Sequence, residues 1–246
     1  MTPPLVLLHA FPMDSRMFDA VRPAITAQTR LLTPDLRGFG AGPALGDPPP
    51  PPDLALLAAD VIDEMDAAGI DKAVIGGVSM GGYIALALLR AHPDRVGGLV
   101  LVDTRSGADD DAALERRRVA ADKADRGEIA AGPDAIAPLI ADDAADDTRS
   151  TLAGIAGAVP AASIAWGQRA MAGRPDSTEL LAAVRVPLLV VVGEKDGVTP
   201  PTVARQMAAA ASEAELVELP GVGHLSPAED PDGFSAALLG WLARRF

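Results

Sequence analysis

A serine between two glycines, in the segment Gly77-Val78-Ser79-Met80-Gly81, is the residue best placed in this chain to do chemistry. β-Branched residues precede the segment and an apolar, helix-like spacing follows it, so we expect a strand to turn abruptly into a helix at Ser79. Glycines keep Cβ atoms out of such a crowded turn and leave the hydroxyl exposed at the edge of a sheet. This context favours a nucleophile over a helix N-cap.

A serine hydroxyl is a weak nucleophile near neutral pH and needs a general base, for which the chain offers three histidines. His92 stands before a proline at the end of a helical pattern, and the end of a helix explains it. His9 follows an apolar run and is typical of a residue that shapes a turn. His224 stands on a glycine-rich loop between the last predicted strand and the last predicted helix. We therefore expect His224 to be the base.

The base in turn needs an acid that orients its ring. Asp196 lies just past the apolar run 188–192, and Asp103 ends an earlier apolar run, so both belong at the same edge of a parallel sheet. Asp196 is preferred because it leaves the chain order Ser, Asp, His, with the acid on the strand before the histidine loop. Asp103 and Glu194 remain alternatives.

The elements that must position these residues alternate along the chain. Short apolar runs predict strands at 5–8, 30–33, 73–78, 98–102, 188–192 and 215–219, and helical spacing appears at 54–68, 81–91, 201–211 and 231–245. Nearly continuous apolar strands indicate an α/β fold, with a mostly parallel sheet covered by helices on both faces. Helical spacing without a convincing strand predicts a cap insertion at 104–183 between the two parts of a core domain, 1–103 and 184–246.

Composition narrows the cofactors and partners. A formal net charge of -13 argues against a nucleic-acid partner, because phosphate binding needs clustered Lys and Arg. The absence of Cys excludes disulfides and thiolate chemistry, and the three histidines form no paired metal motif, so we expect no metal and no cofactor. A short apolar N-terminus without a basic segment favours a cytoplasmic protein that does not bind a membrane. The oligomeric state is not predicted.

Five segments in a fixed order resemble the α/β-hydrolase superfamily over almost the whole chain. They are His9-Ala10-Phe11-Pro12, Asp35-Leu36-Arg37-Gly38-Phe39-Gly40, Gly77 to Gly81, Gly193 to Asp196, and Gly221 to His224. The resemblance implies Ser79 as nucleophile, His224 as base and Asp196 as acid. It also implies an oxyanion hole made by the backbone N–H groups of Phe11 and Met80. The chain looks most similar to small bacterial esterases, 3-oxoadipate enol-lactonases and cofactor-free haloperoxidases.

Two departures from the family pattern affect the expected fold. Family members usually begin with a β-hairpin ahead of the strand that leads into the oxyanion loop, whereas here that strand begins at Leu5. We therefore expect about six strands instead of about eight. In addition Ala10 replaces the commoner glycine after the loop histidine, which restricts the backbone but leaves the amide donor available.

Together these residues predict a serine hydrolase that cleaves a small, largely apolar ester or lactone through an acyl-enzyme intermediate. The candidate pocket residues are mostly apolar, and each has a packing alternative in the core: Met13, Met17, Trp166, Val198 and Leu225, beside Phe11 and Met80. A carbon-carbon bond hydrolase and a cofactor-free haloperoxidase or perhydrolase are alternatives on the same triad. A non-catalytic ligand-binding protein on a hydrolase scaffold is the alternative of another class.

Overall fold

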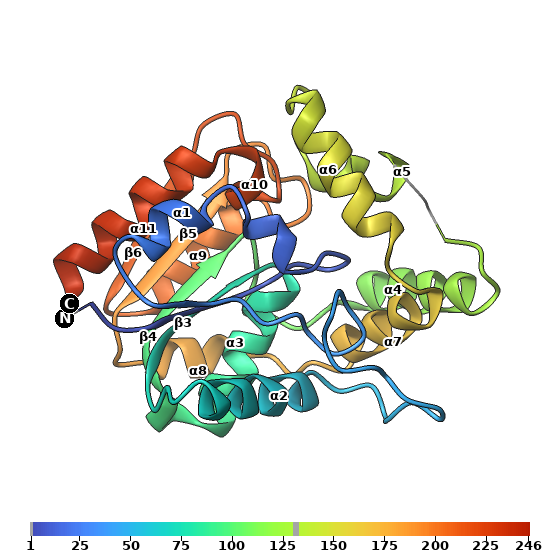
Figure 1. The fold of residues 1–246 in the computed structure, drawn as a ribbon, viewed down its shortest axis with the longest axis horizontal. Coiled ribbons are helices and arrows are strands. Elements are labelled where there is room, and N and C mark those ends of the chain that lie inside the picture. Colours follow the sequence, from blue (N-terminus) through green and yellow to red (C-terminus); the bar gives the residue numbers. More distant parts are fainter. Residues whose placement is uncertain (1, 130–132) are drawn as a thin grey trace.

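One parallel sheet forms the centre of the molecule. The computed structural model describes residues 2–129 and 133–246, and within them six strands pair in the order β2-β1-β3-β4-β5-β6, all parallel (Figure 1). They are β1 (Leu5–Leu8), β2 (Leu31–Leu32), β3 (Ala73–Val78), β4 (Val96–Val102), β5 (Leu188–Gly193) and β6 (Ala214–Leu219). The predicted sheet of about six strands is confirmed, with β2 shorter than expected and β4 beginning earlier, at Val96.

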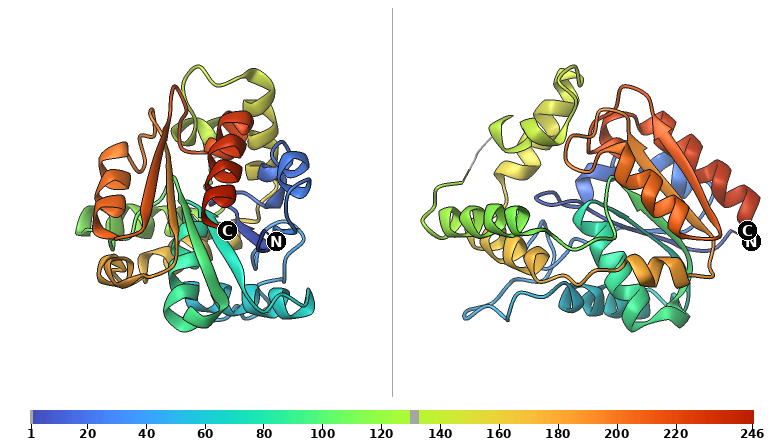
Figure 2. Two further views of the ribbon diagram at one scale, coloured as in Figure 1. Left: turned by 90° about the vertical axis from the view of Figure 1, so that its left-hand side faces the viewer. Right: turned by 180° about the vertical axis from the view of Figure 1, so that it is seen from behind.

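Helices cover both faces of this sheet, as expected for a parallel α/β fold. Figure 1 and Figure 2 show α1 and α11 on one face and α2, α3, α8 and α9 on the other. Their bounds are α1 (Arg22–Thr26), α2 (Leu54–Ala67), α3 (Met80–Ala91), α8 (Thr178–Ala183), α9 (Pro201–Ala210) and α11 (Pro231–Arg245). Shorter elements are η1 (Ser15–Phe18), η2 (Pro93–Arg95), η3 (Ala137–Leu139) and α10 (Ser226–Glu229).

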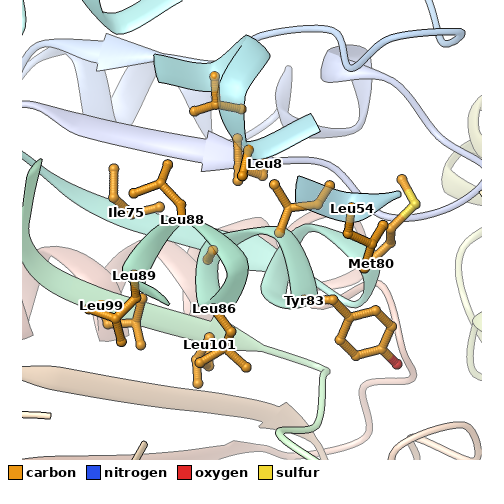
Figure 3. Packing of buried hydrophobic residues seen from close by; sticks show 14 of the residues in the cluster. Leu8, Leu54, Ile75, Met80, Tyr83, Leu86, Leu88, Leu89, Leu99 and Leu101 are labelled. Carbon is orange, nitrogen blue, oxygen red and sulfur yellow. The ribbon is translucent and has the colours of Figure 1, made fainter. Parts of the chain in front are cut away.

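Alternating strand residues build a separate hydrophobic core on each face. In β1, Leu5 and Leu7 join the cluster beneath α1 and α11, while Val6 and Leu8 join the cluster that includes α2 and α3. Figure 3 shows part of this second cluster, where side chains of β1, β3 and β4 meet those of α3. Burying each Leu, Ile or Val side chain stabilises the fold by about 1.5–3 kcal/mol, so both faces hold the sheet in place.

The long connection between β4 and β5 is helical. It contains α4 (Asp111–Asp125), α5 (Pro133–Ile136), η3, α6 (Asp146–Gly157), α7 (Ala161–Ala172) and α8. Helices α4 to α7 lie beyond the carboxyl ends of the strands, and α4 packs against α7, whereas α8 packs beside α9 (Figure 1, Figure 2). Within the described residues no single helix is long and apolar enough to cross a bilayer. Helices α6 and α7 taken together have that length and apolar character, but they are bent by 94° relative to each other.

Because all the strands run in one direction, their carboxyl ends meet at one edge of the sheet. Ser79 follows β3, Asp103 follows β4, Asp196 follows β5 and His224 follows β6. The chain moves outward from β1 to β2 and then returns to place β3 on the other side of β1. Such a switch point opens a crevice outside the strand ends, where open α/β sheets bind their ligands.

Candidate active site

Ser79 is held in a strained turn between β3 and α3. Its φ of 52° lies in the left-handed region that side chains other than glycine rarely adopt. A Cβ on Gly77 would collide with the backbone of Gly81, and a Cβ on Gly81 would collide with the carbonyl oxygen of Leu8. The Thr104 hydroxyl donates a hydrogen bond to the Ser79 carbonyl oxygen at 2.7 Å. Both glycines are therefore needed for the close backbone approach that aims the serine away from the sheet.

Three side chains from separate loops meet at this turn. The Ser79 Oγ lies 2.8 Å from Nε2 of His224, and Nδ1 of the same ring lies 2.8 Å from Oδ2 of Asp196. All three residues are largely buried, although the serine and the histidine are 145 residues apart in the chain. The structure thus brings the predicted nucleophile, base and acid into one hydrogen-bonded row.

Asp196 is fixed by donors that surround its carboxylate. Oδ1 accepts the backbone N–H groups of Val198 at 2.8 Å and Thr199 at 2.9 Å, and Oδ2 accepts the Thr199 hydroxyl at 2.7 Å. Burial by itself raises the pKa of Asp196, but the hydrogen bond from His224 and those from Thr199 outweigh it and hold the pKa below its ordinary value. The carboxylate therefore stays ionised beside the imidazole. Sequence reasoning missed Thr199, although a hydroxyl so soon after an aspartate is typical of a loop-closing hydrogen bond.

Asp103, the alternative acid, has different partners. Its carboxylate accepts the N–H groups of Gly193 at 2.9 Å and Ser226 at 3.0 Å, so it joins the end of β5 to the loop that carries His224. Its side chain is completely buried, and burial raises its pKa to about 7, with the negative charge of Asp196 acting in the same direction. Glu194, the other alternative, accepts the Gly221 N–H at 2.9 Å on an exposed turn.

The loop of His224 is anchored by Glu229, a second residue that sequence reasoning missed. The Glu229 carboxylate accepts the N–H groups on either side of the histidine, those of Gly223 and Leu225, each at 3.0 Å. It also accepts the Ala141 N–H at 2.8 Å, and the His224 N–H donates to the Leu139 carbonyl at 3.1 Å. His224 is therefore tied directly to the helical segment that follows β4.

Phe11 and Met80 carry the two backbone amides that the family resemblance implies for the oxyanion hole. Ala10 donates its N–H to Sδ of Met17 at 3.3 Å, whereas the N–H groups of Phe11 and Met80 have no acceptor among residues 2–129 and 133–246. Met80 is the first residue of α3, where the partial positive charge of the helix dipole favours an anion. The two amides that the family resemblance implied thus remain available as donors.

The ring of His9 makes hydrogen bonds that suit a structural role. Its Nδ1 lies 2.9 Å from the Ala10 carbonyl oxygen and Nε2 accepts the Leu36 N–H at 3.0 Å, so both ring nitrogens have backbone partners. Burial lowers the pKa of His9, which keeps the ring neutral. Among the described residues, no group of three or more His, Cys, Asp and Glu side chains is arranged to hold a metal ion.

A cavity of about 480 Å³ opens over Ser79 and His224. Of the predicted pocket residues, Phe11 and Val198 line it, and most of the other lining residues come from the segment between α4 and α7, together with Pro12 and with Tyr83 of α3. By contrast Met13, Met17, Met80, Trp166 and Leu225 are buried in the two hydrophobic clusters. Apolar residues suit a core as well as a pocket, and packing placed these five in the core. A larger cavity of about 690 Å³, beside residues 38–46 and 158–163, contains none of the three hydrogen-bonded side chains.

Comparison with known proteins agrees with this arrangement of strands and loops. The model of a family described as alpha/beta hydrolase fold matches residues 3–231. The chain belongs to the alpha/beta hydrolase fold family. The family resemblance read from the five sequence segments is thus confirmed.

Relatives of this alpha/beta hydrolase are named as enzymes that act on esters and lactones. It is 28% identical to a pimeloyl-[acyl-carrier protein] methyl ester esterase of Edwardsiella ictaluri, over 95% of this chain and 91% of that protein. It is 26% identical to 3-oxoadipate enol-lactonase 1 of Acinetobacter baylyi, over 98% of this chain and 88% of that protein. A thermophilic esterase from Thermogutta terrifontis superposes with a TM-score of 0.90 at 33% identity, covering 98% and 90% of the two chains.

Proposed function

We propose that this alpha/beta hydrolase is a serine hydrolase that cleaves a small ester or lactone. The observation that carries the proposal is the hydrogen-bonded row in which the Ser79 Oγ lies 2.8 Å from His224 Nε2 and Asp196 lies 2.8 Å from His224 Nδ1. A hydroxyl becomes a useful nucleophile when a base is within hydrogen-bond reach and a third group orients that base. The relatives named as esterases and as an enol-lactonase support the same class of reaction.

The chemistry follows from the roles of these groups. His224 accepts the Ser79 proton as Oγ attacks the ester carbonyl, and the Phe11 and Met80 amides donate to the oxygen that becomes negative. The protonated imidazole then gives its proton to the leaving alcohol, and an acyl-serine remains. Water, deprotonated by His224, attacks the acyl group and releases the acid. Asp196 stabilises the imidazolium in both halves of the reaction.

We also propose residues 104–183 as a cap on a core of residues 1–103 and 184–246. Residues of α4, η3 and α7 line the cavity over Ser79, so this segment contributes most of the surface that a substrate would contact. Most of the lining side chains, such as Phe11, Ile164 and Met171, are apolar. A small-molecule ester or lactone with an apolar chain fits this surface.

Replacing Ser79 tests the proposed function. The wild-type protein should hydrolyse p-nitrophenyl acetate and short lactones and should react with a fluorophosphonate probe, while Ser79→Ala should lose both properties. The thermal midpoint of Ser79→Ala should stay near that of the wild type, because the hydroxyl serves the reaction rather than the core. A wild-type protein that binds such molecules without turnover and without labelling would instead be a ligand-binding protein on a hydrolase scaffold.

A further inference from the structure

Positively charged side chains line part of the cavity over Ser79, although the chain as a whole has a net charge of -13. Arg117 and Lys123 project from α4, and the amide side chain of Gln168 comes from the facing helix α7. The acidic residues Asp122 and Asp125 of α4 pair instead with Arg118 and Arg169, and none of these four residues lines the cavity. The helix therefore carries its acidic groups elsewhere and contributes cations to the cavity.

The carboxylates near these two cations do not neutralise them. Asp109 receives hydrogen bonds from Arg117 and from Arg174, so two guanidinium groups share one carboxylate. Glu128, which also lines the cavity, is paired through both oxygens with Arg126, and Lys123 acts on it only as a nearby charge. Each group of three therefore has a net charge of +1, and its members that line the cavity are Arg117 in the first group and Lys123 and Glu128 in the second.

Hydrogen-bond donors remain available on the same wall. Arg117 uses Nε toward Asp109 and Nη1 toward Oε1 of Gln168 at 3.1 Å, while its Nη2 has no acceptor among the described residues. The side-chain amide nitrogen of Gln168 and Nζ of Lys123 likewise have no acceptor within residues 2–129 and 133–246. A guanidinium edge matches the two oxygens of a carboxylate, and an ammonium group on the same cavity adds a further positive charge that attracts it.

We propose that the ester or lactone bound over Ser79 carries a second, anionic group, a carboxylate at the far end of an apolar chain, and that Arg117, Lys123 and Gln168 select it. This inference rests on the proposed function and names the substrate class of that site. The apolar side chains of the cavity lining take the chain, and the α4 cations Arg117 and Lys123 take the charged end. A neutral ester of the same length would leave the uncompensated positive charges without a partner.

Monomethyl and dimethyl adipate form the matched pair of test ligands. They share the chain and the scissile methyl ester and differ only in whether the far carboxyl group is charged. We expect Ser79→Ala protein to bind monomethyl adipate about tenfold or more tightly than dimethyl adipate in low-salt buffer, as measured by isothermal titration calorimetry. Added NaCl should reduce the ratio, because salt screens charges that are partly exposed. In wild-type protein the ratio of kcat/KM for the two esters should show the same preference.

Substitutions on α4 locate the source of the preference. In the Ser79→Ala background, Lys123→Gln and Arg117→Gln should each lower the ratio of the two affinities by about threefold or more. The matched control is Arg118→Gln, which removes the same charge from the same helix at a residue that pairs with Glu115 and Asp122 outside the cavity. In this control the ratio of the two ester affinities should stay at the value of the Ser79→Ala protein. Lys123 is exposed, so its substitution tests the inference even if Arg117→Gln destabilises the cap.

Equal affinity of Ser79→Ala protein for the two esters would overturn the inference, as would a preference that persists when Lys123 and Arg117 are both replaced. Because this binding is measured without turnover, the result does not depend on hydrolysis by the wild-type protein. A wild-type protein that cleaves dimethyl adipate but shows no preference would refute the anionic substrate and leave the serine hydrolase intact. A protein that prefers the monoester but cleaves neither compound, does not hydrolyse p-nitrophenyl acetate or short lactones and does not react with the fluorophosphonate probe would refute the hydrolase and leave the anionic site intact.

Discussion

At the scale of single residues, two buried aspartates lie close to the same histidine and are distinguished by their hydrogen bonds. Asp196 contacts the His224 ring, whereas Asp103 accepts two backbone N–H groups that belong to the neighbouring loops. Asp196 therefore contacts the proposed base directly, whereas Asp103 holds the neighbouring loops in position. Their pKa values move in opposite directions: complete burial raises the pKa of Asp103, whereas for Asp196 the hydrogen bonds from His224 and Thr199 outweigh burial and lower the pKa.

Replacing each aspartate by asparagine should separate these roles. Asp196→Asn should lower kcat by roughly 1,000- to 10,000-fold, because the amide can no longer stabilise the imidazolium or hold its tautomer. Asp103→Asn should lower kcat by less than about tenfold, because His224 keeps its partner. Steady-state kinetics on a p-nitrophenyl ester measures both. A larger loss in Asp103→Asn than in Asp196→Asn would reverse the assignment.

The raised pKa of Asp103 also predicts how stability depends on pH. In the unfolded chain this carboxyl releases its proton near 3.8, whereas in the folded protein it holds the proton up to about pH 7. Between these values the folded state binds more protons than the unfolded state, so the contribution of Asp103 to the free energy of unfolding falls as pH rises.

Urea titrations of wild type and Asp103→Asn at a series of pH values test this. Between pH 4 and pH 7 the free energy of unfolding of the wild type should fall by roughly 2–4 kcal/mol relative to that of Asp103→Asn, because position 103 does not titrate in the variant. A constant difference between the two proteins over this range would contradict the raised pKa.

At the scale of elements, the turn from β3 into α3 depends on the absence of two Cβ atoms. Gly81 lies against the carbonyl oxygen of Leu8 in β1, and Gly77 lies against the backbone of Gly81. The turn, the helix and the neighbouring strand are thus packed backbone to backbone. Ser79 keeps its unfavourable φ because all three elements hold it there.

Gly81→Ala should therefore destabilise the protein by about 3 kcal/mol or more, since a backbone atom rather than a flexible side chain blocks the added methyl group. The matched control is Gly154→Ala in α6, where nothing lies within 4 Å of the added Cβ. That substitution should stabilise the protein by about 0.5–1 kcal/mol through the better helix propensity of alanine. Thermal denaturation distinguishes the two, and equal stability of both variants would contradict the tight approach.

At the scale of the whole molecule, Asp109 connects the two ends of the proposed cap. It lies just before α4, and its carboxylate binds Arg117 within α4 and Arg174 just after α7. Burial opposes ionisation of Asp109, but the hydrogen bonds from Arg174 and Arg117 outweigh it and lower its pKa to about 2. Arg174 also stacks its guanidinium on the ring of Tyr83, 4.1 Å away, so this cluster joins the cap to α3.

Asp109→Asn should lower the free energy of unfolding at pH 7 by about 1–3 kcal/mol, because two guanidinium groups lose their shared partner. The folded-state pKa is depressed, so this stabilisation is present above pH 4 and is lost as pH falls toward 2. The wild type and Asp109→Asn should then converge at acid pH in denaturant titrations. A variant as stable as the wild type at pH 7 would show that the cluster contributes nothing to stability.

The sequence by itself determined the local parts of this protein. Apolar strands, helical spacing and the glycine pattern around Ser79 depend on sterics between residues close in the chain. They therefore predicted the six-stranded α/β fold and the sharp turn at Ser79. The fixed order of Ser79, Asp196 and His224 along parallel strands predicted which side chains share an edge. The geometry of that site agrees with the order.

Only the tertiary structure decided what lies around those three side chains. Thr199 and Glu229 act through hydrogen bonds to groups that no local pattern connects to them, and Met13 and Trp166 are in the core because packing, not spacing, selects between core and cavity. The charged wall that Arg117 presents to the cavity depends on how α4 folds back over the sheet edge. Such contacts join segments far apart in sequence, so the packing of whole elements determines them.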